Sequence, residues 1–283
     1  IEELFNKTLE LSDCNAEATV KKFIYKTIQE TSGPLSRREY SKKFILNRII
    51  RDIDENRVVI ISFNYDDLIE RALQQNGHVD LSCNFSYRVQ FKDRTNWDSY
   101  EKGYNGTLEL LKLHGSFNWL FCNNCKNIEL HWYSRYGDIT FCKNKKCSKI
   151  KLVPILIPPA INKDQIFKKY GNIFERLWVE VEDSLEKANE IVIAGYSFRE
   201  ADEKAREIIG RSIANNFNLP MLTIVDKHPT EIRDVIFKIS GEDAKHFFRI
   251  VTFSCFEEFV ENGESINKVL CTGKGTAGTQ KIR

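Results

Sequence analysis

The chain has 283 residues, of which 42% are hydrophobic, and its formal net charge at pH 7 is +2. This length and composition predict one large domain, or one domain carrying an insert, with a full hydrophobic core. Acidic and basic residues are interleaved, which argues against a dedicated nucleic-acid-binding protein. No apolar run reaches the roughly 20 residues that cross a bilayer and no signal peptide is evident, so we expect a soluble, cytoplasmic protein without a membrane partner.

The first predicted region is helical and covers residues 1–56. It is rich in Lys, Glu and Leu and is interrupted by the SGPLS stretch at 32–36. A homo-oligomer assembled through these helices is compatible with the pattern, although no single residue argues for it. Residue 1 is Ile and the only methionine is Met221, which suggests a piece of a longer protein.

Six short runs then follow, each apolar on both faces, which is typical of strands in a covered parallel sheet. Helical patterns follow most of these runs, and in the helix predicted within residues 66–77, Asp67 and Glu70 have the spacing of a capping box. Such alternation predicts an α/β fold built on a doubly wound, Rossmann-like parallel sheet. The six runs are residues 58–63, 108–113, 152–157, 191–196, 221–225 and 249–253.

Sheets of this type bind ligands at the carboxyl ends of their strands, so polar residues at those ends are candidate site residues. His114 ends one predicted strand, and Gly115 after it permits close approach of a ligand to the backbone. The local sequence leaves a catalytic and a structural interpretation of His114 equally open.

A second candidate stretch follows the strand that ends near Phe63. We expect Asp66 or Asp67 to act as the N-cap of the next helix. The side-chain amide of Asn64, at the end of a buried strand, needs backbone, water or a ligand as its partner. Asn64 and His114 should therefore lie in neighbouring loops that face one crevice.

Four of the eight cysteines fall in one window with the spacing of metal-binding knuckles. Cys122 and Cys125 form a C-x2-C pair, and Cys142 and Cys147 form a C-x4-C pair. This pattern predicts a structural Zn²⁺ bound by four thiolates, with His131 as an alternative ligand. A site closed by four thiolates has no open position for substrate, so we expect this zinc to take no part in chemistry.

Three of these stretches resemble sirtuins, and more closely the divergent sirtuin-like domains of bacterial defence proteins. SFNYDDLIE at 62–70 resembles the Asn-x-Asp catalytic loop, and KLHGS at 112–116 resembles the segment with the catalytic histidine. The cysteine pairs resemble the zinc ribbon that follows it, which we expect as an insert at residues 121–152.

Two further stretches extend the resemblance. VIAGYSF at 192–198 is similar to the Gly-x-Ser turn that contacts the dinucleotide. LTIVDKHP at 222–229 is similar to the strand end whose polar residue reaches an adenosine ribose. The order and rough spacing of all five agree over residues 58–228.

The resemblance implies cleavage of the bond between nicotinamide and ribose of NAD, with NAD as substrate and zinc as a structural ion. It implies three catalytic residues: Asn64 holds a water or the ribose, Asp66 supports that geometry, and His114 accepts a proton. It also implies dinucleotide contacts from Gly115, Gly195, Ser197 and Asp226.

One family feature has no counterpart in the sequence, namely the first strand and its Gly-Ala-Gly phosphate loop before Val58. The run GKGTAGT at 273–279 lies in a tail, residues 272–283, that we expect to be disordered. This pattern suggests that the first strand and glycine loop are missing. The expected sirtuin-type domain then covers residues 57–271.

The resemblance favours hydrolysis of NAD to nicotinamide and ADP-ribose, because Tyr65, Trp119 and the GYSF turn resemble the defence-type branch. In that branch the domain is commonly joined to a sensor domain and acts in anti-phage defence. An NAD-dependent protein lysine deacylase is the alternative within the family. A noncatalytic NAD-binding or scaffold module is the alternative from another class, and a zinc-ribbon nucleic-acid binder is a weaker third.

Overall fold

The computed structural model describes residues 58–75, 85–87, 89, 108–130, 140–157, 169–170, 172–241 and 249–261. The predicted helical segment 1–56, the tail 272–283 and His131 lie outside these residues, so the predicted domain boundaries stay predictions. The described residues form a mixed α/β fold with parallel sheets, as predicted. The chain divides into two compact units, and among the described residues the boundary lies between Leu177 and Trp178.

The first unit contains a three-stranded parallel sheet in the order β1-β3-β2. Strands β1 (Val59–Ser62) and β2 (Phe85–Ser86) flank β3 (Leu108–Lys112), which is almost entirely buried. Ser62 pairs with Lys112, so β1 and β3 end side by side. Helix α4 (Leu68–Gln75) follows β1 after a loop of five residues, 63–67, which we call the β1–α4 loop.

The second sheet of this unit is antiparallel and has the order β5-β4-β6. Strand β4 (Gly115–Phe121) is buried along its whole length, between β5 (Ile128–Leu130) and β6 (Val153–Leu156). The prediction that the run at 152–157 joins the parallel sheet is therefore wrong. The run does form a strand, but an apolar run on its own does not distinguish a parallel from an antiparallel neighbour.

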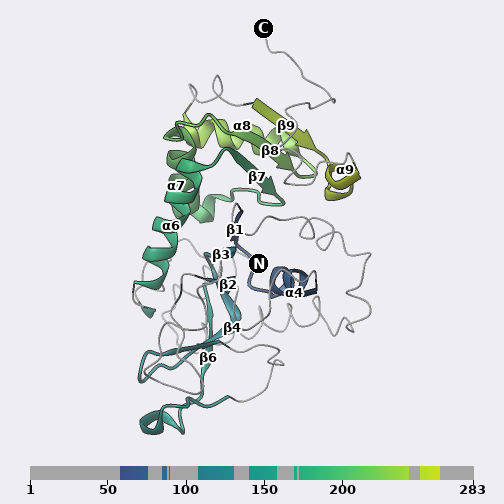
Figure 1. The fold of residues 1–283 in the computed structure, drawn as a ribbon. Coiled ribbons are helices and arrows are strands. Elements are labelled where there is room, and N and C mark those ends of the chain that lie inside the picture. The colour runs from purple at the N-terminus through teal and green to yellow at the C-terminus, as the bar shows by residue number, and fades with distance from the viewer. Residues whose placement is uncertain are drawn as a thin grey trace. The chain divides into compact units, whose positions relative to one another are not determined.

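The second unit is built on a parallel sheet in the order β7-β8-β9. Helices follow its strands in turn, which is the predicted strand–helix alternation (Figure 1). Among the described residues, no helix combines the length and the apolar character needed to span a bilayer. Helix α6 (Ile173–Lys187) contains the boundary between the units. The elements that follow it are β7 (Glu190–Ala194), α7 (Glu203–Ala214), β8 (Met221–Val225), α8 (Pro229–Ser240), β9 (Arg249–Phe253) and α9 (Phe256–Glu261).

Local sequence explains how α7 and α8 are placed. Pro229 opens α8 at its first turn, where a missing N–H group costs nothing, and Gly241 follows its end with φ +91°. A Cβ on Gly210 would lie 2.3 Å from the carbonyl oxygen of Ile239, so only glycine allows α7 and α8 to approach this closely. Two short 3-10 helices complete the described elements, η1 (Lys145–Cys147) and η2 (Glu200–Asp202).

Candidate functional site

The β1–α4 loop is held by its backbone to the segment that contains His114. Ser62 O accepts from Leu113 N at 3.0 Å, and Tyr65 O accepts from Phe117 N at 3.1 Å. Ser116 Oγ donates to the same Tyr65 oxygen at 3.2 Å. The structure therefore brings the two predicted loops together, because β1 and β3 are parallel neighbours that end at the same edge.

His114 is buried, with 8% of its surface exposed, and packs among aromatic rings of the β1–α4 loop. Its ring contacts Phe63 edge-on at a centroid distance of 5.3 Å and stacks with Tyr65 at 6.1 Å. The Tyr65 hydroxyl donates to Ile157 O, and Ile157 N donates to His114 O at 2.9 Å. The contacts with the rings of Phe63 and Tyr65 restrict the orientation of the imidazole.

Asn64 and Asp66 lie in different surroundings within this loop. The side chain of Asn64 is exposed, so water, one of the three partners expected for its amide, can reach it. Asp66 Oδ1 accepts from Leu68 N at 3.1 Å. This bond satisfies the first N–H group of α4, while Asp67 directly precedes the helix and its carbonyl accepts from Arg71 N at 3.0 Å, so which of the two is the N-cap stays a prediction.

Glu70 does not act as the expected capping-box partner in the described contacts. Its Oε1 instead accepts from Lys112 Nζ at 2.9 Å and from the Tyr87 hydroxyl at 3.1 Å. Burial raises the pKa of the Glu70 carboxyl and also that of the Tyr87 hydroxyl. Glu70 is therefore part of a buried polar cluster beneath the loop.

The backbone of Gly115 lies close to another group, as expected, but this group belongs to the protein and not to a ligand. Gly115 has φ +79°, and a Cβ placed on it would lie 2.3 Å from Ile155 O in β6. This packing accounts for the glycine without a ligand.

The remaining predicted contact residues lie at the carboxyl ends of β7 and β8 in the second unit. Gly195 has φ +62°, and its N–H donates to Val225 O at 3.0 Å. A Cβ on Gly195 would meet nothing within 4 Å, and both Gly195 and Ser197 are exposed. Asp226 Oδ1 accepts from His228 N at 2.9 Å, which orients its carboxylate. Gly195 and Asp226 thus lie on neighbouring strand ends.

The turn that contains Gly195 and Ser197 is stabilised from within the second unit. Phe198 is buried and has φ +50°, and its carbonyl accepts from Arg206 Nη1 at 2.6 Å. The Tyr196 hydroxyl donates to Asp202 Oδ2 at 3.3 Å. Burial and the Asp202 carboxylate raise the pKa of Tyr196, so this hydroxyl stays protonated as a donor.

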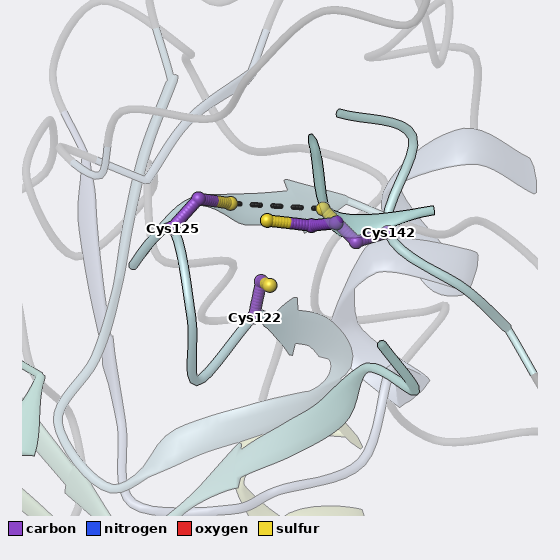
Figure 2. A group of neighbouring side chains, drawn as sticks. Cys122, Cys125 and Cys142 are labelled. Carbon is purple, nitrogen blue, oxygen red and sulfur yellow. Dashed lines mark hydrogen bonds between the residues drawn. The ribbon is translucent and has the colours of Figure 1, made fainter. Parts of the chain in front are cut away.

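The four predicted metal ligands meet in one cluster. The sulfur atoms of Cys122, Cys125, Cys142 and Cys147 all lie within 4.8 Å of one another. Figure 2 shows Cys122 and Cys125, from a turn after β4, facing Cys142, and the Sγ atoms of Cys125 and Cys142 are 3.6 Å apart. Tetrahedral Zn²⁺ with bonds of about 2.3 Å needs sulfur atoms about 3.8 Å apart, so the cluster fits this ion.

Hydrogen bonds to the sulfur atoms further support a metal site. Burial raises the pKa of the Cys122 thiol, but N–H groups of Cys125 and Asn124 outweigh it, and the net pKa is lowered. Asn124 Nδ2 donates to the Cys147 sulfur at 3.0 Å, and Asn127 Nδ2 to the Cys125 sulfur at 3.1 Å. Such donors favour thiolates, which are the form that binds zinc, whereas burial raises the pKa of the Cys125 and Cys142 thiols, a cost that a bound Zn²⁺ would offset.

The sequence model of the SIR2-like domain family matches residues 58–241. The chain belongs to this family. The predicted resemblance to sirtuins is confirmed at the level of the family, whose domains use NAD. No curated protein matches the chain significantly.

Within this SIR2-like domain, the buried residues that hold the β1–α4 loop, chiefly Lys112, were not predicted from the sequence. One signal was available, because Lys112 is the only charged residue besides Glu109 in an otherwise apolar strand. A lysine in a buried strand needs a partner of opposite charge. The sequence did not identify Glu70 as that partner, since its spacing from Asp67 fitted a capping box equally well.

Proposed function

We propose that this SIR2-like domain hydrolyses NAD to nicotinamide and ADP-ribose. The observation that carries the proposal is the attachment of the Asn64 loop beside His114, within a domain of an NAD-using family. The bond between the nicotinamide nitrogen and the ribose carbon breaks, and its electron pair stays with the nitrogen, so that neutral nicotinamide leaves. A water oxygen bonds to the ribose carbon, and one proton is released.

Three residues of the first unit carry this chemistry in our proposal. The exposed amide of Asn64 holds the attacking water or a ribose hydroxyl. His114 accepts the proton, and its packing between Phe63 and Tyr65 restricts the ring to few orientations, which lowers the entropy cost of reaction. Asp66 fixes the loop through its bond to Leu68 N.

In this proposal the dinucleotide contacts are Gly195, Ser197 and Asp226, whereas Gly115 is set aside because Ile155 O occupies the space in front of it. The open space in front of Gly195 admits a phosphate to its backbone, and the exposed Ser197 hydroxyl donates to it. The carboxylate of Asp226 accepts from ribose hydroxyls. Strand ends are the usual binding positions of parallel α/β sheets, which supports this assignment.

Zinc holds the ribbon in this proposal and takes no part in the reaction. Four thiolates of the cysteine cluster would complete a tetrahedral shell around the ion, so no coordination position would remain for NAD or water. The ion therefore supplies folding free energy to the first unit.

The biological setting that we propose is depletion of NAD during anti-phage defence in the bacterial cytoplasm, triggered by a fused or separate sensor domain. Support comes from the resemblance of Tyr65 to the defence-type branch and from its contact with His114. Trp119 gives less support to the defence-type branch, because it is fully buried against Tyr87 and packing accounts for it.

The test is nicotinamide release from NAD, measured with and without an acyl-lysine peptide. We expect release without peptide and a loss of about 100-fold or more in both variants, because His114→Ala removes a positioned proton acceptor and Asn64→Ala removes a positioned hydrogen-bonding group. Asn215→Ala is the matched control, since Asn215 is exposed on the second unit and its side-chain amide donates to Glu186 Oε1 at 3.4 Å.

The other outcomes separate the alternatives. Release that requires the peptide identifies a lysine deacylase. Folded, zinc-loaded protein that binds NAD but releases no nicotinamide under either condition is a noncatalytic binding module, and the hydrolase proposal is then wrong.

A further inference from the structure

Lys112 is the most unusual buried residue of the first unit. It is the last residue of β3, its side chain is only 1% exposed, and it is two residues before His114. Lysine is almost never fully buried unless it is paired. Its position and its partners therefore need an explanation.

The ammonium group of Lys112 joins two elements to β3. Its Nζ donates to Glu70 Oε1 in the first turn of α4 at 2.9 Å, and the carboxyl of Glu70 is equally buried. The same Nζ donates to the backbone carbonyl of Asp66 in the β1–α4 loop. The Tyr87 hydroxyl donates to Glu70 Oε1 and completes the cluster.

Stability does not account for this ion pair. Removing two charges from water costs about as much as their attraction returns, so apolar side chains of similar volume would serve a core equally well. An apolar side chain would not, however, hold the Asp66 carbonyl. The specific result of placing a charged lysine here is a fixed backbone position between Asn64 and α4.

We propose that Lys112 and Glu70 are positioning residues that fix the β1–α4 loop, and with it Asn64, beside His114. Lys112 donates to the loop carbonyl, and Glu70 balances the buried charge. The inference deepens the proposed NAD hydrolysis, and the expected effect of Lys112 on the reaction rate rests on that proposed function. The expected effect of Lys112 on the position of the loop does not depend on that activity.

The experiment uses the full chain and a variant that removes the whole cluster, Lys112→Met with Glu70→Met and Tyr87→Phe. No buried charge is left unpaired, but the Asp66 carbonyl loses its hydrogen-bond donor and the Asn118 side chain loses its interaction with the Tyr87 hydroxyl, so we expect the fold to be retained with a modest fall in melting temperature. A second variant, Lys112→Met with Glu70→Gln, keeps an acceptor for Tyr87 and covers the case in which the first variant does not fold.

Two amide groups report on the loop directly in hydrogen-exchange measurements. Asn64 N donates to Ser62 Oγ at 3.2 Å, and Leu68 N donates to Asp66 Oδ1. We expect both to exchange at least about 10-fold faster in the variant, since the loop loses its tie to β3. The amide of Gly195 in the second unit serves as the internal control.

In the activity assay we expect kcat to fall at least about 10-fold with KM for NAD within about 3-fold, because misplacement affects the reaction more than binding. Lys187→Met, which breaks an exposed ion pair with Asp183, should change neither exchange nor rate. Unchanged exchange at Asn64 and Leu68, or an unchanged kcat in an active protein, overturns the proposal. If the original protein does not cleave NAD, the proposed function fails and exchange alone decides the role of Lys112.

Discussion

Gly115 illustrates at the scale of one residue how a functional and a structural reason compete for the same position. The sequence suggested a ligand near its backbone, whereas the structure has Ile155 O in that place. Gly195 shows the opposite case, since it too has positive φ but a Cβ on it would meet nothing within 4 Å. Two glycines at strand ends thus differ in what surrounds them, which no residue count or spacing reveals.

We predict that Gly115→Ala destabilises the protein much more than Gly195→Ala. Both changes place an L residue at positive φ, which costs roughly 1–2 kcal/mol. Only Gly115→Ala adds a clash with the backbone of β6, so β4 and β6 must separate. Urea unfolding of both variants measures the difference, and equal losses of unfolding free energy would contradict the packing argument.

At the scale of an element, the cysteine ribbon shows how strand pairing brings together short segments that have only a small hydrophobic core. Its cluster of buried residues consists of Leu120, Leu152 and three of the cysteines, with Cys125 packed against it. For the four cysteines to bind one ion, the turn with Cys122 and Cys125 has to face the segment with Cys142 and Cys147. Strand β4 brings this about, because it pairs with β5 on one side and β6 on the other and leads directly into Cys122.

We predict that the protein binds one zinc ion per chain and that Cys142→Ser abolishes this binding. The serine hydroxyl is a poor zinc ligand, and three thiolates leave the tetrahedral shell open. Cys255→Ser is the control, because Cys255 is an exposed free cysteine in the second unit. Elemental analysis of the purified proteins measures the zinc. Retention of a full equivalent by Cys142→Ser would exclude the four-cysteine site.

At the scale of the whole molecule, parallel strand order decides which distant stretches become neighbours. Residues 62–67 and 112–117 are brought together by β1 and β3, and residues 195 and 226 by β7 and β8. Each pair meets inside one unit because parallel neighbours point their carboxyl ends to the same edge. A dinucleotide ligand that binds at such edges should stabilise the native state as a whole.

We predict that NAD raises the melting temperature of the His114→Ala protein, in which the substrate persists. Ligand at 100 times its Kd adds about 2.7 kcal/mol to the free energy of unfolding. Asp226→Ala in the same background should weaken NAD binding by about 10-fold or more, since it removes charged acceptors of ribose hydroxyls. Asp183→Ala, at an exposed helix position, is the control. Equal NAD affinity of the Asp226 and Asp183 variants would remove Asp226 from the binding residues.

The sequence by itself determined the family, the α/β class, six of the nine described strands near their observed bounds and the four-cysteine cluster, but it did not predict β2, β4 or β5. These features are local: apolar runs, cap residues and ligand spacing act over a few neighbouring positions. Tertiary structure decided that β6 runs antiparallel beside β4, that Gly115 is packed against Ile155, and that Lys112 pairs with Glu70. Each of these depends on which strand lies next to which, and sheet neighbours are selected by the burial of whole faces rather than by any one segment.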